Sequence, residues 1–398
     1  MSAARDHRKR RGAAIPRSTL ASLLLVIGGA CAITSLAAAM NSRSSGGWVW
    51  QLPRGFPQPR VPAGNPMTAA KVVLGRRLFY DRRLSGNDTE SCSSCHQQRL
   101  AFTDGRAQAV GSTGELTPRS AQSLVNVAYN ATLTWANPAL VTLEQQVEVP
   151  LLSEHPVEMG VTDANEGRIL ARLRGDRWYR VHFRQAFPAA KQPVSFTTIV
   201  RSLAAFERTI ISADSRYDRY LRGQATLTAA ERRGMNLFMG ERTGCTHCHG
   251  SFIFNDQDTY AGAPNETPQF HNTGLYNLGG TGAYPAPNRG LFEITGVPSD
   301  MGRFRAPSLR NVALTAPYMH DGSIKTLADV IDFYAAGGRV IRSGPLAGDG
   351  RANPYKDAEI APIKLSARDR ADLVAFLKTL TDWSLVRDPR FSNPFHHQ

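Results

Sequence analysis

Two short stretches, Cys92-Ser93-Ser94-Cys95-His96 and Cys245-Thr246-His247-Cys248-His249, decide the interpretation of this 398-residue chain. Each has the pattern C-x-x-C-H, which is the attachment signature of a c-type haem. The two cysteines of such a motif lie one helical turn apart, so both sulfurs can bond to the vinyl groups of one porphyrin. The adjacent histidine then reaches the iron as its proximal ligand. The sequence therefore predicts two covalently bound haem c groups, at His96 and at His249.

Other uses of a cysteine pair are less consistent with this pattern. A single C-x-x-C-H string is also compatible with a zinc half-site or with a redox-active dithiol. Here the two strings lie 153 residues apart and take up four of the five cysteines, and neither has the second cysteine pair that a closed zinc site requires. The fifth cysteine, Cys31, lies in an apolar N-terminal run. The dihaem interpretation is therefore favoured.

The composition is that of a soluble globular protein with room for two domains of ordinary size. Hydrophobic residues make up 42% of the chain and charged residues 20%, both normal values for this class. The 34 glycines and 24 prolines predict a loop-rich fold, which suits a chain wrapped around cofactors. No basic stripe interleaved with aromatic residues indicates a nucleic-acid partner.

The N-terminal 46 residues have the character of a targeting segment. They hold seven basic residues and one acid, so they contribute +6 to the net charge of +14. Six of the basic residues precede an apolar run from Leu20 to Ala39, as in a secretory signal. The run is also about 20 residues long, enough to span a bilayer if it is not cleaved. Residues 1–46 are predicted to be a signal peptide or membrane anchor, and either one places the body of the protein in the periplasm.

The rest of the chain repeats one plan twice, namely a helix, a C-x-x-C-H motif, a loop and a second helix. Apolar spacing and capping residues predict helices over about 68–80, 196–211, 228–238, 326–335 and 367–380, and strands have almost no support. We therefore predict a mainly α fold of two cytochrome c-like domains, residues 47–222 and 223–398, with the connection near residues 217–223. The loop at 259–298, rich in Gly, Pro and Asn, is long enough to be functional or to cover a haem.

Three longer strings carry a resemblance to a known family. They run from Leu74-Gly75 through Leu84-Ser85, over Phe206-Glu207-Arg208-Thr209-Ile210, and from Phe304 through Gly322. Together they resemble the bacterial dihaem cytochrome c peroxidase and MauG family, over roughly residues 66–382. Residues 133–138 (LTWANP) and 154–160 (EHPVEMG) are most similar to the MbnH-type branch. The resemblance implies an extracytoplasmic oxidoreductase that uses hydrogen peroxide to form high-valent haem iron and to oxidise a partner protein, in that branch at tryptophan.

The same resemblance assigns roles around the first haem, where peroxide is expected to react. Glu158 occupies the family position of the distal acid, which moves a proton between the two peroxide oxygens. Gln146 matches the pocket glutamine, and Gln145 is the alternative in a register shifted by one residue. No histidine occurs between His96 and His155, so we expect a five-coordinate iron that is open at rest.

At the second haem the resemblance implies that Tyr334 is the sixth ligand, because it falls where the peroxidases have a methionine and MauG-like enzymes a tyrosine. A phenolate stabilises oxidised iron and lowers its reduction potential, whereas methionine raises it. The alternative is that Tyr334 only packs and that Met301, Met319 or His320 binds the iron.

Two further features are implied between the haems. Trp135 matches the family tryptophan that exchanges electrons between the irons, and the alternative is a packing tryptophan. Thr315 and Pro317 match two ligands of a calcium ion, which accepts oxygen donors of several kinds. The third family ligand is an asparagine that follows an arginine, and here Ser120 follows Arg119.

Two other functions compete with the MauG-like oxidase. A dihaem peroxidase would reduce hydrogen peroxide with electrons from a small cytochrome or a cupredoxin. A dihaem electron carrier would have two six-coordinate irons and no need for Glu158. The lack of an evident distal histidine or methionine near the first haem disfavours the carrier.

Overall fold

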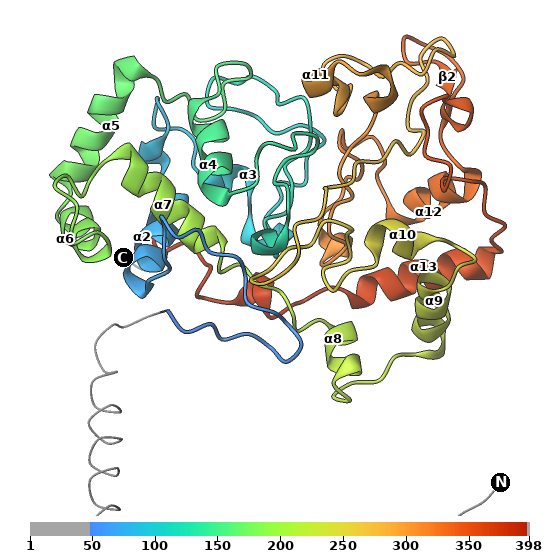
Figure 1. Cartoon of the computed structure of the whole chain (residues 1–398), viewed down its shortest axis with the longest axis horizontal. Helices are drawn as coiled ribbons and strands as arrows, with labels where there is room; N and C mark the ends of the chain where they lie inside the picture. Colours follow the sequence, from blue (N-terminus) through green and yellow to red (C-terminus); the bar gives the residue numbers. More distant parts are fainter. Residues whose placement is uncertain (1–47, 396–398) are drawn as a thin grey trace, which may run out of the picture. The chain divides into compact units, whose positions relative to one another are not determined.

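The computed structural model describes residues 48–395, and the targeting segment predicted at residues 1–46 lies outside this range. The described chain is mainly helical (Figure 1). Its strands within this range are β1 (Val340–Ile341) and β2 (Gly348–Asp349), which pair antiparallel over two residues each. None of the helices between residues 48 and 395 has the length and apolar character needed to cross a membrane. The mainly α prediction is confirmed.

The helices fall into two sets along the sequence. The first set comprises α2 (Ala69–Phe79), α3 (Cys92–Cys95), α4 (Leu143–Leu152), α5 (Asp163–Gly175), α6 (Arg177–Ala186), α7 (Phe196–Glu207) and α8 (Arg216–Leu221). The second set comprises α9 (Ala229–Met239), α10 (Cys245–His249), α11 (Phe292–Thr295), α12 (Leu327–Ala336) and α13 (Ala367–Thr379). Figure 1 shows α2 to α7 gathered on one side and α9 to α13 on the other.

In the first set, α2 crosses α7 at very short range. Thr68 caps the start of α2 by accepting a hydrogen bond from the amide of Lys71. Gly75 lies at the crossing, and a Cβ atom there would come within 1.9 Å of the carbonyl oxygen of Ser202 and 2.9 Å of Cβ of Phe206. Only glycine therefore permits these helices to pack so closely.

The second set uses the same contact between α9 and α13. Thr228 caps α9, and Gly234 lies at the crossing. A Cβ atom at Gly234 would lie 1.8 Å from the carbonyl oxygen of Asp372 and 2.9 Å from Cβ of Phe376. Both helix crossings therefore use a glycine on one helix against a phenylalanine on the other.

A loop repeat accompanies the helix repeat. Residues 121–128 (AQSLVNVA) and 306–313 (APSLRNVA) share six of eight residues. Asn126 and Asn311 both have a left-handed backbone, with φ of 58° and 63°. Each uses its side chain to accept a hydrogen bond from a backbone amide that follows a long helix, at Ser212 after α7 and at Asp382 after α13. The two halves of the sequence therefore share this loop as well as the helix crossing.

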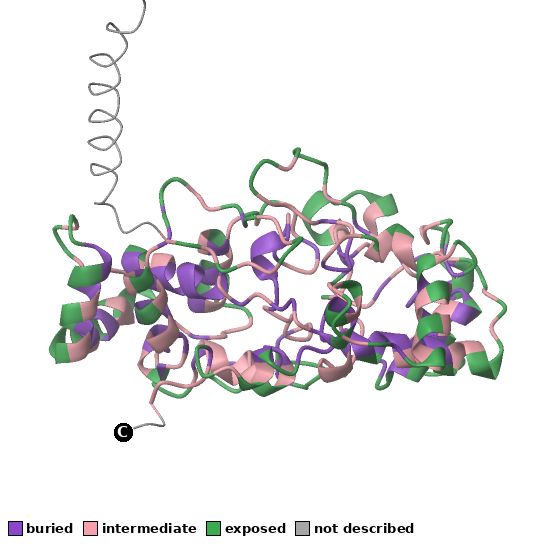
Figure 2. Ribbon diagram, turned by 90° about the horizontal axis from the view of Figure 1, so that it is seen from below, coloured by how far each residue is buried: buried purple, intermediate pink, exposed green. Residues whose placement is uncertain are grey.

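Each half has its own apolar core. One core combines α2 with α4 to α7, and the other combines α9, α12 and α13. Figure 2 shows buried and exposed positions on opposite faces of the same helices. The halves are joined by a buried carboxylate, Asp382, which accepts hydrogen bonds from the hydroxyl of Ser212 and the amide of Ala213.

The structure refines several of the predicted elements. The helix expected over 196–211 ends at Glu207, because the amide of Thr209 turns back to the carbonyl of Phe206 in a tighter bond. The expected connection at 217–223 contains the short helix α8. Helices α4, α5 and α6 were not predicted, although Tyr179, Phe183 and Ala186 of α6 have helical spacing and are buried.

Candidate functional site: two cysteine–histidine cavities

The first C-x-x-C-H motif orients its histidine through one backbone carbonyl. Nδ1 of His96 lies 2.9 Å from the carbonyl oxygen of Phe102. A carbonyl only accepts, so the ring proton is on Nδ1 and the lone pair of Nε2 is free for a metal. Burial lowers the pKa of His96, which keeps the ring neutral, the form that binds iron.

The second motif repeats this arrangement. Nδ1 of His249 donates to the carbonyl oxygen of Phe254 at 2.9 Å, and burial lowers the pKa of His249. Phe102 and Phe254 both have a left-handed backbone, with φ of 61° and 58°. This conformation is uncommon for a bulky residue, and here it turns the carbonyl toward the ring in both halves.

A cavity of about 70 Å³ adjoins the first motif. Cys92, Cys95 and His96 line it together with Gln146 and Glu158. The structure therefore brings together the residues that the sequence predicts around the first haem.

The register of the two glutamines follows from their contacts. Gln145 accepts hydrogen bonds from the amide and hydroxyl of Thr142 and so caps α4. Gln146 lies on the cavity wall, and its buried Oε1 has no hydrogen-bond partner among the described residues. Of the two glutamines, Gln146 is therefore the one whose side chain is available to a molecule in the cavity.

Three acids, Glu90, Glu158 and Glu207, line this cavity, and burial shifts the pKa of two of them. Burial raises the pKa of Glu158, which favours a carboxyl that can hold a proton. Glu207, at the end of α7, also lines the cavity, and burial raises its pKa to about 8. No group in residues 48–395 donates a hydrogen bond to the Glu207 side chain. Glu207 lies within the family string at residues 206–210 and no role is predicted for it there; an acid beside the buried apolar residues of this helix was the available signal.

A second cavity, of about 260 Å³, adjoins the second motif. Cys245, Cys248 and His249 line it together with Tyr334 of α12. Burial raises the pKa of Tyr334, so the phenolate forms there only if a nearby cation replaces the proton.

The alternative ligands differ in their placement. Met319 and His320 also line the second cavity, whereas Met301 does not. The ring of His320 stacks on Phe304 with 3.7 Å between centroids, and this contact holds the imidazole against an aromatic side chain. Tyr334 lines the same cavity from α12.

Trp135 lies on the wall of this second cavity. Its indole N–H donates to the carbonyl oxygen of Ser120 at 3.0 Å, and its ring meets the edge of His320 with 6.5 Å between centroids. The indole is therefore held in one orientation by groups from both halves of the chain.

The residues around the second cavity fit a covalently bound haem. Arg305 lies on its wall with Nη1 buried and without a partner among the described residues. Burial lowers the pKa of Arg305 to about 10, so the guanidinium remains charged at neutral pH. An unpaired buried cation beside a C-x-x-C-H motif suits a carboxylate such as a haem propionate.

The residues expected around calcium also share this wall. Thr315 and Pro317 line the cavity with Ser120. Within residues 48–395, the carbonyl oxygens of Thr315 and Pro317 accept no hydrogen bond. Free carbonyl oxygens are the donors that a hard cation takes.

Two half-buried histidines, each beside a cysteine pair and each at its own cavity, define a dihaem protein of the cytochrome c type. The comparisons with known proteins agree, because residues 69–226 match the family model described as di-haem cytochrome c peroxidase. The chain belongs to the dihaem cytochrome c peroxidase and MauG family, whose members are haem-dependent oxidoreductases.

Individual relatives cover most of the chain. It is 31% identical to the methylamine utilization protein MauG of Methylorubrum extorquens, over 91% of this chain and 94% of that protein. It is 35% identical to the cytochrome-c peroxidase IdrP1 of Denitromonas iodatirespirans, over 85% and 89%. A crystal structure of a MauG-like protein associated with microbial copper homeostasis superposes with a TM-score of 0.86 at 59% identity, over 87% and 99%.

Proposed function

We propose that this protein is an extracytoplasmic MauG-like oxidase that uses hydrogen peroxide to oxidise a partner protein. The bound haems would supply the reaction with peroxide and hold the oxidising equivalents. The observation that carries the proposal is that Tyr334 shares the second cavity with His249. A phenolate favours oxidised iron, which suits a centre that stores oxidising equivalents better than one that accepts electrons from a cytochrome.

The residues of the first cavity suit peroxide. Glu158 lines the cavity and burial raises the pKa of its carboxyl group, so the carboxylate can take a proton from one peroxide oxygen and return it to the other. The Gln146 amide supplies a polar contact from α4 that orients the small ligand. Glu158, Gln146 and His96 are the residues that we assign to this step.

We assign electron exchange between the two centres to Trp135. Its fixed N–H bond to Ser120 keeps the ring in place, and an indole can lose an electron reversibly. Trp135→Phe should leave peroxide binding intact but confine oxidation to one iron. Rapid-mixing spectroscopy checks this, and oxidation of both irons at an unchanged rate would remove the relay role.

The partner is a protein that meets the surface of the oxidase. The relative at 59% identity is associated with microbial copper homeostasis, and we place this chain in the same setting, with tryptophan on the partner as the oxidised residue. Calcium at Thr315 and Pro317 completes the proposed set of bound groups, and its role would be to hold the segment beside Trp135.

A second function is favoured by one observation. Met159 lies on the wall of the first cavity, and as a sixth ligand there it would make the protein a dihaem electron carrier. Met159 also belongs to the apolar core of the first half, and this packing role accounts for its burial without an iron bond.

The deciding experiment adds one equivalent of peroxide to the diferric protein without reductant and follows both irons by Mössbauer spectroscopy. We expect both irons to be oxidised. A reaction only after reduction of the second haem would indicate a conventional peroxidase, and no reaction would indicate a carrier.

Variants of the second cavity test the ligand itself. Tyr334→Met should raise the reduction potential of the second haem and shift the protein toward peroxidase behaviour. Tyr318→Phe is the matched control, because Tyr318 lines the same cavity but its hydroxyl donates to the carbonyl of Val312. An unchanged spectrum of the second haem in Tyr334→Met would contradict ligation by Tyr334.

A further inference from the structure

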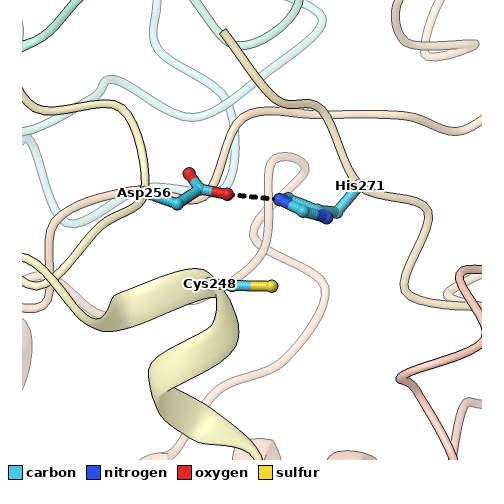
Figure 3. A group of neighbouring side chains, drawn as sticks. All are labelled: Cys248, Asp256 and His271. Atoms are coloured by element: carbon cyan, nitrogen blue, oxygen red, sulfur yellow. Dashed lines mark hydrogen bonds and ion pairs between the residues drawn. The ribbon is translucent and has the colours of Figure 1, made fainter. Parts of the chain in front are cut away.

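A charged cluster lies beside the second C-x-x-C-H motif and has no part in the function proposed above. Cys248, Asp256 and His271 bring their sulfur, oxygen and nitrogen atoms within 4.8 Å of one another. Figure 3 shows His271 and Asp256 facing each other, with Cys248 at the end of the adjacent helix. His271 also lines the second cavity.

Both ring nitrogens of His271 are engaged by carboxylates. Nε2 lies 2.5 Å from Asp256 and Nδ1 lies 2.8 Å from Asp357. Carboxylate oxygens only accept, so both nitrogens carry a proton and the ring is an imidazolium. Burial by itself would lower the pKa of His271, but the hydrogen bonds to Asp256 and Asp357 raise it above its usual range.

These contacts argue against a metal site. A histidine ligand must offer a lone pair, and the ring of His271 has none while both carboxylates hold it. Cys248 belongs to the haem attachment motif, so its sulfur is already committed. The cluster is therefore a set of fixed charges beside Cys248, a cysteine that would hold the second haem.

The charges are balanced in two pairs. His271 and Asp256 form the pair beside Cys248, and Asp357 is neutralised on its far side by Arg303 at 2.9 Å. The side chains of His271, Asp256 and Asp357 are 13–17% exposed, so water screens them only in part. Charges at this depth act on a neighbouring centre much more strongly than surface charges do.

We propose that the imidazolium of His271, balanced by Asp256, sets the reduction potential of the second haem. This inference rests on the attachment of that haem at Cys248, and it makes His271 a residue that acts on the iron from outside its ligand set. Loss of the Asp256 charge leaves a cation beside the haem, which favours the reduced iron. Loss of the His271 charge leaves a carboxylate there, which favours the oxidised iron.

The other charged and titratable groups around the cluster do not alter this sign. Arg305, His249, Tyr334 and Glu359 line the same cavity as His271. All four remain in place in every variant, so they enter each measurement equally.

The test is a spectroelectrochemical titration of both haems in the intact holoprotein. Asp256→Asn should shift the potential of the second haem upward, and His271→Gln should shift it downward. His271→Arg, which keeps the charge, should restore a value near that of the unchanged protein. The first haem serves as an internal reference and should not move.

Two controls separate a charge effect from a loss of structure. His247→Gln alters a histidine between the same two cysteines whose side chain is 42% exposed, and it should leave the potential unchanged. Asp357→Asn breaks the ion pair between Asp357 and Arg303. It should shift the reduction potential of the second haem less than Asp256→Asn does.

The results also separate this inference from the oxidase function. Shifts of the same sign in Asp256→Asn and His271→Gln, or no shift in either, would overturn the inference and leave His271 as a structural clamp. The potentials are measured without peroxide or a partner protein, so failure of the oxidase proposal would not affect them. If His271→Gln does not incorporate haem, the inference is tested by Asp256→Asn and Asp357→Asn alone. A larger upward shift in Asp256→Asn supports it, and equal shifts or no shift in the two variants would overturn it.

Discussion

Single atoms decide which side chains of this protein can do chemistry. The histidines of both C-x-x-C-H motifs are oriented by a carbonyl, that of Phe102 or Phe254, that forms no part of the motif. Gln145 and Gln146 are neighbours with the same side chain, yet one caps a helix and the other faces a cavity. The residue type in the sequence indicates which side chains are candidates for a role, and the contacts of each side chain show which candidate faces the cavity.

Glu158 provides the test at this scale. Glu158→Gln removes the group that can carry a proton but keeps its size, so we expect the reaction with peroxide to slow by roughly 10²–10⁴-fold. Stopped-flow spectroscopy of the first haem measures this rate. Glu154→Gln, an exposed acid in the same loop, is the matched control. A rate that falls equally in both variants would assign Glu158 to the loop rather than to the proton.

The elements owe their arrangement to two helix crossings. Gly75 in α2 and Gly234 in α9 let the carbonyl oxygens of Ser202 and Asp372 approach where a side chain would stand. Each crossing brings the helix before a C-x-x-C-H motif onto a later helix of its half, α7 or α13. The crossing therefore positions the motif, and its glycine is a packing requirement rather than a weak point of the helix.

Gly234→Ala should destabilise the protein by about 1–3 kcal/mol or more, because α9 and α13 must separate to admit one methyl group. Thermal unfolding followed by circular dichroism measures the effect. Gly167→Ala in α5 is the control, since a Cβ atom there meets nothing within 4 Å. It should stabilise the protein by about 0.5–1 kcal/mol. Equal effects at the two sites would contradict the close crossing.

At the scale of the whole molecule, the free energy of unfolding depends on pH because Glu207 is buried without an ion-pair partner among the described residues. Arg208, next to Glu207, is the nearby cation, and it already pairs with Glu144 at 2.9 Å. Glu207 is therefore left neutral in the folded chain, with its pKa raised to about 8 by burial. The folded state then holds a proton that the unfolded state releases at lower pH.

The sign of the pH dependence follows from this difference. Between the ordinary pKa of 4.5 and about 8, the folded state binds more protons, so its stability falls as the pH rises. The contribution is complete below pH 4.5 and is lost as the pH passes about 8.

Glu207→Gln stays uncharged, so its stability relative to the unchanged protein should increase from pH 5 to pH 8, by about 1.4 kcal/mol per unit of pKa difference at most. Denaturant unfolding at several pH values measures this. Glu148→Gln, at an exposed position, should show no such trend. A parallel pH profile for Glu207→Gln and the unchanged protein would mean that Glu207 is ionised when folded.

The sequence by itself predicted haem attachment at Cys92, Cys95, Cys245 and Cys248, and it determined the mainly α fold and the starts of α9, α12 and α13. These features depend on local chemistry, namely motif spacing, capping side chains and apolar periodicity within one turn or two. The family resemblance added Glu158, Trp135 and Tyr334 as candidates for roles that stay proposals. Only the tertiary structure brought Glu207 to the first cavity, placed Gln146 rather than Gln145 on its wall and enclosed His271 between Asp256 and Asp357. Those outcomes depend on burial and on partners up to 86 residues away, and such long-range contacts leave no pattern in a short window of sequence.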